Sequence, residues 1–269
     1  MKITRILLSL LACALLAVIA YSSLQLWDIH QIGVQEAEIH SRLMQYKPET
    51  EPAIPATLTP ESTSAPDRAD ESTPDPAPDP DTSGANPSIV ALQATRPEAV
   101  GWLTVPNTQI DYPFAQGKDN EHFLYLDLDQ RWSASGTIFM DFRNSRDFSD
   151  FNTVLFGHHM RNGSMFGTLQ HFNDRAFFEA NQHGTIFLAD QTHTIDFFAF
   201  AVIPPDDAVI YNPTITTEAE AAAFLDHVES TARYFRDIGV TANDRLITLS
   251  TCNYEFYDAR MVLIGRLSD

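Results

Sequence analysis

The sequence predicts a mainly β protein, a closed eight-stranded β-barrel with a few peripheral helices, preceded by a transmembrane helix and a disordered stalk. Three observations lead to this fold class. Residues 6–27 form an uncharged apolar run, residues 47–88 are rich in proline and acidic side chains, and eight short strand-like runs follow within about 180 residues.

The N-terminal run Ile6–Trp27 contains 22 uncharged residues. At about 1.5 Å per residue, a helix of this length crosses a hydrocarbon core of about 30 Å. Lys2 and Arg5 precede the run and Asp28 follows it, which predicts a cytoplasmic N-terminus and an extracellular remainder. A cleavable signal peptide, with Val18–Ala20 as the cleavage site, is the alternative. Both interpretations export the rest of the chain.

Two segments separate this anchor from the folded part of the chain. Residues 28–46 are expected to form a juxtamembrane helix, because apolar residues recur there at nearly helical spacing. Residues 47–88 contain ten of the sixteen prolines and carry a net charge of -7 (two basic, nine acidic), so they cannot bury a core. The predicted division is therefore 1–27 N-terminus and anchor, 28–46 helix, 47–88 disordered linker and 89–269 catalytic domain.

Short runs of β-branched, aromatic and aliphatic residues recur after residue 89, separated by turn signals. Two stretches are helical instead: 165–182, as one or two short helices, and 217–234, which opens with Thr217 and early acidic residues that favour a helix N-terminus. The predicted strands are Val100–Val105, Gln109–Pro113, Gly136–Asp141, Thr153–Gly157, Gly184–Ala189, Thr192–Ile203, Arg245–Cys252 and Arg260–Leu267.

The chain has a formal net charge of -19, and no segment forms a basic patch. Nucleic acid is therefore excluded as an expected partner, because binding to phosphate backbones depends on clustered Lys and Arg. The acidic surface of the exported part favours solubility outside the membrane over adhesion to anionic lipid.

The folded part of the chain contains one thiol, Cys252, since the only other cysteine, Cys13, lies in the apolar N-terminal run. An exported domain could form a disulfide, but Cys252 has no partner within its own domain. A lone thiol accompanied by His and Arg elsewhere is a candidate nucleophile. The competing interpretation is a buried cysteine that serves only in packing.

Arg260 begins the strand that follows the Cys252 strand, and a hairpin between the two would bring Arg260 close to Cys252. A guanidinium there could stabilise a thiolate or an oxyanion. Alternation places Ser250 on the same strand face as Cys252, where it could line a substrate groove, and Thr251 could contribute to the oxyanion site. Both are also compatible with ordinary strand positions.

The catalytic base or acid should be a histidine, and two of the nine histidines, His158 and His159, follow a predicted strand directly. A metal site on this pair is not expected, because adjacent side chains diverge and no Cys or carboxylate cluster has ligand spacing nearby. Three acidic residues flank the histidines, and we expect them to lie on a solvated loop: Asp141, Asp147 and Asp150.

Taken together, these motifs resemble the sortase family, class B. Thr248-Leu-Ser-Thr-Cys252 with a downstream Arg260 is similar to the sortase signature, and residues 152–169 closely resemble the class B histidine motif. Val100–Leu103, Ile110–Pro113 and Gln116–Asn120 match the same class in order and spacing. The resemblance covers roughly residues 90–269. It points to His158 as the functional histidine, because the family histidine directly follows the glycine; His159 stands where Asn is common.

The resemblance implies a sortase-type barrel and a cysteine transpeptidase that needs no metal or organic cofactor. Cys252 would attack a Thr carbonyl in the C-terminal sorting motif of a secreted protein, His158 would protonate the leaving amine, and Arg260 would hold the oxyanion. The thioester would then pass to an amine of a peptidoglycan precursor or a pilin. The enzyme would be a single-pass membrane protein with its catalytic domain outside the cell.

Two alternatives stay open beside this function, and a third lacks the sequence motifs that it would need. An exported cysteine peptidase would hydrolyse the same acyl-enzyme, and the sequence cannot separate the two. A stalked, non-enzymatic surface-binding domain would need no reactive thiol. An L,D-transpeptidase also uses cysteine, but it would need a His-Gly and Ser-x-Gly-Cys context that this chain lacks.

Overall fold

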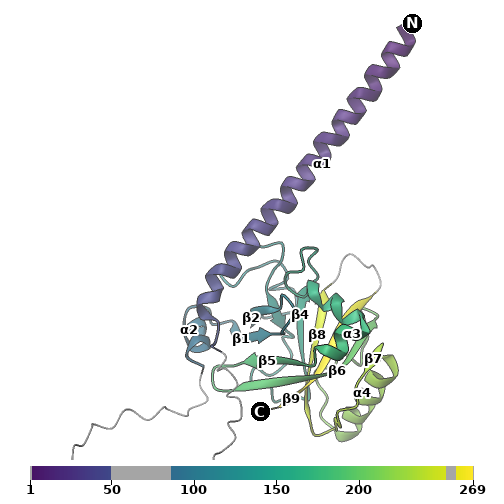
Figure 1. The fold of residues 1–269 in the computed structure, drawn as a ribbon. Coiled ribbons are helices and arrows are strands. Elements are labelled where there is room, and N and C mark those ends of the chain that lie inside the picture. The colour runs from purple at the N-terminus through teal and green to yellow at the C-terminus, as the bar shows by residue number, and fades with distance from the viewer. Residues whose placement is uncertain (1, 50–85, 253–258, 269) are drawn as a thin grey trace, which may run out of the picture.

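The computed structural model describes residues 2–49, 86–252 and 259–268, and it contains a β-barrel from which one long helix projects (Figure 1). The barrel is built from eight strands. They are β1 (Ala99–Thr104), β2 (Asp111–Gln116), β3 (Ile138–Met140), β4 (Asn152–His158), β5 (His183–Phe187), β6 (Thr192–Ile203), β8 (Arg245–Cys252) and β9 (Arg260–Ser268).

The strands pair in the order β5-β1-β2-β3-β4-β8-β9-β6, and an antiparallel pairing between β6 and β5 closes the barrel. A ninth strand, β7 (Tyr234–Phe235), adds two residues to the outer edge of β6. Most neighbours are antiparallel, but β2 pairs with β3 and β4 pairs with β8 in parallel. The predicted closed eight-stranded barrel is confirmed, and so is the β8–β9 hairpin.

The barrel interior is a dry core of large apolar side chains. Ile247 and Leu249 of β8 lie in it with Leu263 of β9 and Phe114 of β2, and all four are fully buried. A second cluster fills the space between the barrel and α4 (Glu218–Thr231), where Phe224 and Val228 pack. Because both faces of β8 are covered, its polar residues Thr248, Ser250 and Thr251 are also buried.

The predicted helices over 217–234 and 165–182 are present. Thr217 caps α4 with a capping box, because its hydroxyl accepts from the Glu220 backbone while the Glu220 carboxylate accepts from the Thr217 backbone. The second stretch forms a 3₁₀ helix, η2 (Gly167–Asn173), and a short helix, α3 (Arg175–Ala180).

Helix α2 (Pro87–Thr95) was not predicted from the sequence. Its first residue is the last proline of the Pro-rich segment, and its missing N–H costs nothing at that position. Ile89 and Leu92 are fully buried in a third apolar cluster around Trp102, on the outside of the barrel wall. The predicted domain boundary at residue 89 therefore falls inside a helix that belongs to the fold.

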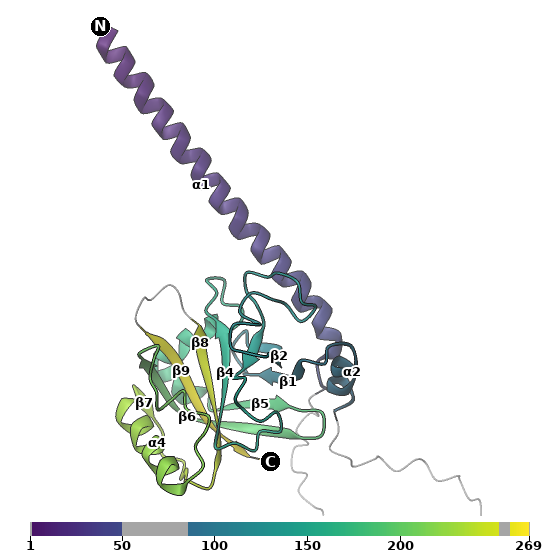
Figure 2. The ribbon, with the colours of Figure 1, turned by 180° about the vertical axis from the view of Figure 1, so that it is seen from behind.

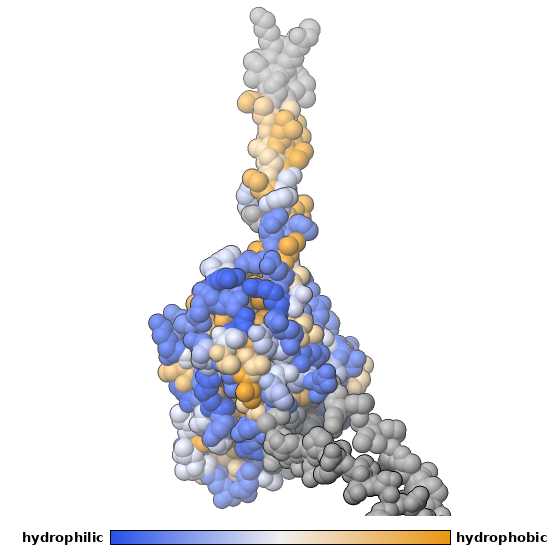
Figure 3. Space-filling view, turned by 90° about the vertical axis from the view of Figure 1, so that its left-hand side faces the viewer, coloured by the Kyte–Doolittle hydropathy of each residue, from blue (hydrophilic) through white to orange (hydrophobic). Residues whose placement is uncertain are grey.

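Helix α1 (Lys2–Leu43) is 42 residues long and continues into η1 (Met44–Tyr46). The predicted anchor and juxtamembrane helix are thus one uninterrupted helix. Its described part is long and apolar enough to cross a membrane, and apolar side chains cover the stretch of the helix between its grey outer end and the domain (Figure 3). The predicted linker falls mostly on residues 50–85, outside the described part of the chain.

The C-terminal end of α1 packs against the barrel domain (Figures 1 and 2). Leu43 is buried in the cluster around Trp102. The Arg42 guanidinium lies 3.1 Å from the carboxylate of Asp129, and Lys47 pairs with Asp111 at 2.5 Å. The last turns of the helix are therefore part of the folded domain.

Candidate active site

The parallel pairing of β4 with β8 brings the two predicted catalytic strand ends together. Their register runs from Asn152 opposite Leu246 to His158 opposite Cys252, so the backbones of His158 and Cys252 are direct neighbours. Both residues are the last of their strands. The thiol of Cys252 and the connection 253–258 lie outside the described part of the structure.

The His158 ring is buried, with 8% of the residue exposed. Its Nε2 lies 2.7 Å from the carbonyl oxygen of Leu124, to which a protonated Nε2 donates a hydrogen bond. The ring of Tyr125 lies against it, with 5.4 Å between ring centroids. Burial lowers the pKa of His158 below its ordinary value, although the Leu124 carbonyl and the negative charge of Glu36 act in the opposite direction.

Arg260 opens β9, next to the strand end that carries Cys252. It is half-buried and pairs in register with Ile203 of β6. The neighbouring backbone N–H, of Met261, donates to the hydroxyl of Thr251 at 3.1 Å, which ties the start of β9 to the end of β8. The hairpin thus brings Arg260 to the same end of the barrel as His158 and Cys252.

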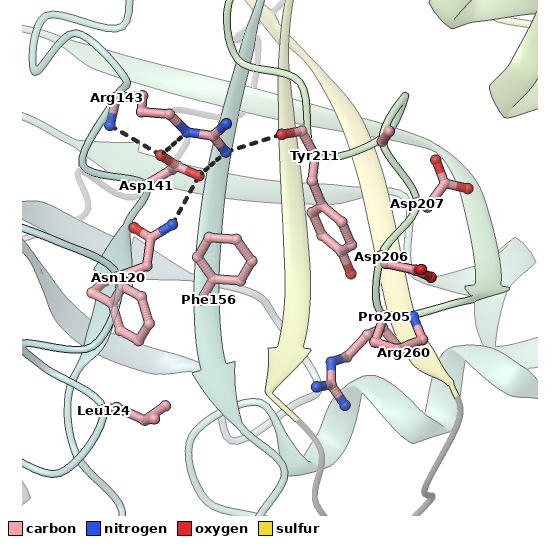
Figure 4. Close-up of a pocket in the computed structure, with 12 residues that line it drawn as sticks. Asn120, Leu124, Asp141, Arg143, Phe156, Pro205, Asp206, Asp207, Tyr211 and Arg260 are labelled. Carbon is pink, nitrogen blue, oxygen red and sulfur yellow. Dashed lines mark hydrogen bonds and ion pairs between the residues drawn. The ribbon is translucent and has the colours of Figure 1, made fainter.

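A cavity of about 440 Å³ opens beside these strand ends (Figure 4). Arg260 lies at one side of it, and the connection between β6 and α4 forms a wall that includes Tyr211. Side chains from β3, β4 and β9 and from the β2–β3 and β3–β4 connections complete the lining. The lining residues are Asn120, Leu124, Phe139, Asp141, Arg143, Phe156, Pro205, Asp206, Asp207, Ala208, Tyr211 and Arg260.

One end of the cavity is fixed by an ion pair between Asp141 and Arg143. The Asp141 side chain is fully buried and accepts from Nε and Nη2 of Arg143, at 2.9 and 2.7 Å. Asn120 also donates to it, at 3.1 Å. Burial raises the pKa of Asp141, but the hydrogen bonds from Arg143 and Asn120 outweigh burial and hold it below its ordinary value.

The same Arg143 reaches across the cavity to the opposite wall. Its Nη2 donates to the carbonyl oxygen of Tyr211 at 3.0 Å (Figure 4). The wall is held a second time by Asp207, whose carboxylate lies 2.9 Å from Nε2 of His227 on α4. Arg143 and His227 therefore fix the position of the β6–α4 connection relative to the barrel.

The predicted substrate-binding residues Ser250 and Thr251 are fully buried. Oγ of Ser250 lies 2.9 Å from the hydroxyl of Tyr211, and Tyr211 lines the cavity. Ser250 is therefore connected to the cavity through the Tyr211 side chain. The Thr251 hydroxyl is bonded to the backbone of Met261 in β9.

Sequence reasoning placed Asp141 on a solvated loop, and this is wrong because the residue is fully buried by Arg143 and Asn120. It also missed Tyr211, whose role depends on a contact with Ser250, 39 residues away. Asn120 was noticed only as part of a motif. The presence of Arg143 two residues after Asp141 was the available signal for the ion pair.

The barrel and this site define a known class of protein. A family model described as "Sortase domain" matches residues 103–268, and the chain belongs to the sortase family. Sortases are cysteine transpeptidases as a family.

Within the family, the similarities are to class B. The chain is 36% identical over 179 residues to sortase B of Listeria monocytogenes, covering 65% of this chain and 72% of the relative. It is 30% identical over 184 residues to sortase B of Staphylococcus aureus, covering 67% and 75%. The chain is therefore a class B member of the family.

Solved structures agree with this assignment. Sortase B of Bacillus anthracis superimposes with a TM-score of 0.64 at 31% identity, covering 69% of this chain and 86% of that chain. Sortase B of Clostridium perfringens gives 0.63 at 33% identity, covering 67% and 99%. A structure of the S. aureus sortase B–substrate complex gives 0.65 at 28% identity, covering 69% and 86%.

Proposed function

We propose that this chain is a membrane-anchored class B sortase that cleaves the C-terminal sorting motif of secreted proteins after Thr and transfers the acyl group to an amine. The acceptor is an amine of a cell-wall precursor or of a pilin. The observation that carries the proposal is the register that pairs His158 with Cys252 on adjacent parallel strands, with Arg260 opening the next strand.

In the proposed reaction, the Cys252 sulfur forms a bond to the Thr carbonyl carbon and the carbonyl electrons move to its oxygen. The tetrahedral intermediate collapses, the C–N bond breaks, and His158 gives a proton to the leaving amine. The resulting thioester is then attacked by the acceptor amine, His158 takes up the proton that this amine loses, and the Cys252 thiolate leaves. The two steps together exchange one amide for another.

Arg260 supplies the positive charge in this proposal. It lines the cavity at the end of the barrel where the two strand ends meet, so its guanidinium is available to an oxyanion that forms on the substrate. A buried His158 is suited to proton transfer, because burial lowers its pKa and makes the imidazolium a stronger acid.

The substrate is proposed to occupy the 440 Å³ cavity, since Arg260 lines it and the substrate complex of the S. aureus relative shares this fold. Ser250 is proposed to act on the substrate through Tyr211, whose hydroxyl it contacts. Thr251 is proposed to support the oxyanion site by fixing the start of β9, where Arg260 lies.

The apolar part of α1 is proposed as a single-pass anchor. Its length and composition are sufficient to cross a membrane, and Lys2 and Arg5 at its start favour a cytoplasmic N-terminus. The catalytic domain then lies outside the cell, where secreted proteins and cell-wall precursors are accessible.

Mass spectrometry of the full chain in detergent micelles tests this function. The enzyme is incubated with peptides of the LPxTG, NPxTN and SPxTG types together with a glycine-based or diaminopimelate-type amine, and Cys252→Ala is the control. We expect a ligated product, cut after Thr, that is absent with the variant. Cleavage without ligation would favour the cysteine peptidase, and the absence of any acyl-enzyme with an alkylatable Cys252 would favour the non-enzymatic surface domain.

A further inference from the structure

The segment that follows His158 is held by a residue from a distant part of the chain, Glu36 of α1. The Glu36 carboxylate oxygen Oε2 accepts from the side-chain amide of Asn162 at 2.7 Å and from the hydroxyl of Ser164 at 3.1 Å. The two donors lie 126 and 128 residues away from Glu36 in sequence. Hydrogen bonds to a carboxylate are stronger than those between neutral groups.

The segment between the two donors is a tight turn that returns to His158. The side-chain oxygen of Asn162 accepts from the backbone N–H of Ser164 at 3.0 Å and lies 2.8 Å from the Ser164 hydroxyl, whose single proton is shared between this oxygen and Glu36. Gly163 adopts a φ of 86°, a conformation that glycine accepts without strain. The N–H of Phe166 then donates to the carbonyl oxygen of His158 at 2.9 Å. Any shift of the turn is therefore passed to the His158 backbone.

Helix α1 is itself fixed against the domain at the level of Glu36. The His40 ring packs against Tyr112 with 4.8 Å between ring centroids, and Ile39 lies against the cluster around Trp102. One turn further on, Arg42 pairs with Asp129. These contacts hold the Glu36 carboxylate in place, so that it can restrain the turn.

The second carboxylate oxygen of Glu36 points to a role beyond tying down the turn. Oε1 is buried and has no hydrogen-bond partner among the described residues. The charge of a half-buried carboxylate is screened less by water than that of a fully exposed one. Its negative charge favours the protonated form of His158 and so raises the pKa that burial lowers.

We propose that Glu36 is a positioning residue for His158, and that the C-terminal turns of α1 therefore belong to the catalytic unit. This inference rests on the proposed function for the role of His158 in turnover. It assigns to the helix that leaves the membrane a direct influence on the reacting histidine. Among the described side chains, the Tyr125 ring on the β2–β3 connection also packs against His158, and the backbone of Cys252 lies in register with it on β8.

The test compares Glu36→Gln with Glu38→Gln in the full chain in detergent micelles. Glu38 is an exposed carboxylate on the same helix, so it matches the change in net charge without touching the turn. The first readout is the NMR titration of His158, which requires no turnover. We expect its pKa to fall in Glu36→Gln and to stay at the wild-type value in Glu38→Gln.

The second readout is steady-state peptide ligation. We expect kcat to fall about three- to tenfold in Glu36→Gln with little change in KM, because only part of the stabilisation lost with a hydrogen bond to a charged group reaches the transition state through the turn. Ser164→Ala removes one restraint but keeps the charge, so it should lower kcat and leave the His158 titration unchanged. If Glu36→Gln does not fold, Asn162→Ala and Ser164→Ala test the same idea, and each should lower kcat.

The inference is overturned if Glu36→Gln shows the wild-type His158 titration, or if its kcat equals that of Glu38→Gln. A lower melting temperature with an unchanged titration would also overturn it, since it would reduce Glu36 to a structural contact. If the wild-type chain ligates no peptide, the proposed function fails, and the titration still decides whether Glu36 acts on His158.

Discussion

A hydrogen bond between Thr248 and Asn152 offers a sharp test of how the barrel supports the cavity wall. Both residues are fully buried, and the Thr248 hydroxyl donates to Oδ1 of Asn152 at 2.8 Å. The Asn152 amide in turn donates to the carbonyl oxygen of Ile210 at 3.0 Å. Ile210 directly precedes Tyr211, which lines the cavity. The pair therefore links β4 and β8 to that wall.

The perturbation is Thr248→Val, which replaces the hydroxyl by a methyl group of similar size. It leaves Oδ1 of Asn152 buried without its donor, and this costs about 1–3 kcal/mol, with about 2 kcal/mol as the central value. For a domain of this size, we expect the melting temperature to fall by about 4–8 °C.

The assay is urea unfolding of the full chain in detergent micelles, followed by the fluorescence of the buried Trp102. Thr194→Val is the matched control, because Thr194 lies exposed on β6 and its substitution should change the free energy of unfolding by less than about 0.5 kcal/mol. Repeating Thr248→Val in an Asn152→Ala background completes a double-mutant cycle.

The outcome of the cycle decides the interpretation. Once Asn152 has lost its side-chain oxygen, removal of the Thr248 hydroxyl should cost almost nothing. Equal stability of Thr248→Val and wild type, or an equal loss in both backgrounds, would refute the assignment of the stabilisation to this hydrogen bond.

Three further predictions concern the site directly. Tyr211→Phe removes the hydroxyl that is hydrogen-bonded to Ser250. It should lower kcat/KM in peptide ligation about two- to tenfold, which is the effect expected for the loss of one neutral hydrogen bond. An unchanged kcat/KM would show that Ser250 has no part in substrate binding. Gly157→Ala places a methyl group 2.8 Å from the Phe166 ring and should destabilise the fold by about 1–3 kcal/mol in urea unfolding, whereas wild-type stability would show that the ring can move aside. Burial lowers the pKa of His158 in the native state, so the unfolded chain, with an ordinary value of 6.5, binds the proton more tightly. The resulting stability is present above pH 6.5 and is lost as pH falls from there through the native pKa. His158→Asn should therefore flatten the decline in unfolding free energy between pH 7 and pH 5, and parallel curves would contradict the cause given for the shift.

Much of the barrel could be predicted from local sequence patterns. The run Thr192–Ile203 was predicted with the bounds observed, because β-branched and aromatic residues dominate it. Helix α4 was predicted because Thr217 and Glu220 form a recognisable cap. The β8–β9 hairpin followed from two adjacent strands with a short connection.

Other elements depend on partners that a local pattern does not contain. Strand β7 has two residues and exists only because β6 offers an edge to it. Helix α2 is specified mainly by the burial of Ile89 and Leu92 against Trp102, and its proline start resembles the segment before it. Closure of the barrel likewise depends on the pairing of β5 with β6, which neither strand's own sequence specifies.

The site divides in the same way. Cys252, His158 and Arg260 could be selected as candidates from the sequence because their flanking residues form motifs, and their catalytic roles stay predictions. Asp141 could not be assigned correctly, since its burial depends on Asn120 and on the walls of the cavity. Glu36 could not be connected with His158 at all, because nothing in either local sequence records a contact across 126 residues.

If α1 is the proposed anchor, its continuity sets both the height and the orientation of the catalytic domain above the bilayer. With the apolar run crossing the membrane as proposed, the part after Trp27 rises about 24 Å before the helix ends. The domain is held at the end of this helix, because Tyr46 and Arg96 lie in contact, 3.5 Å from Oη to Nη1. The height of the domain above the bilayer therefore depends on the length of the helix. One residue inserted between Trp27 and Gln35 would turn the domain by about 100° around the helix axis, whereas seven would raise it by about 10 Å and nearly restore its original facing.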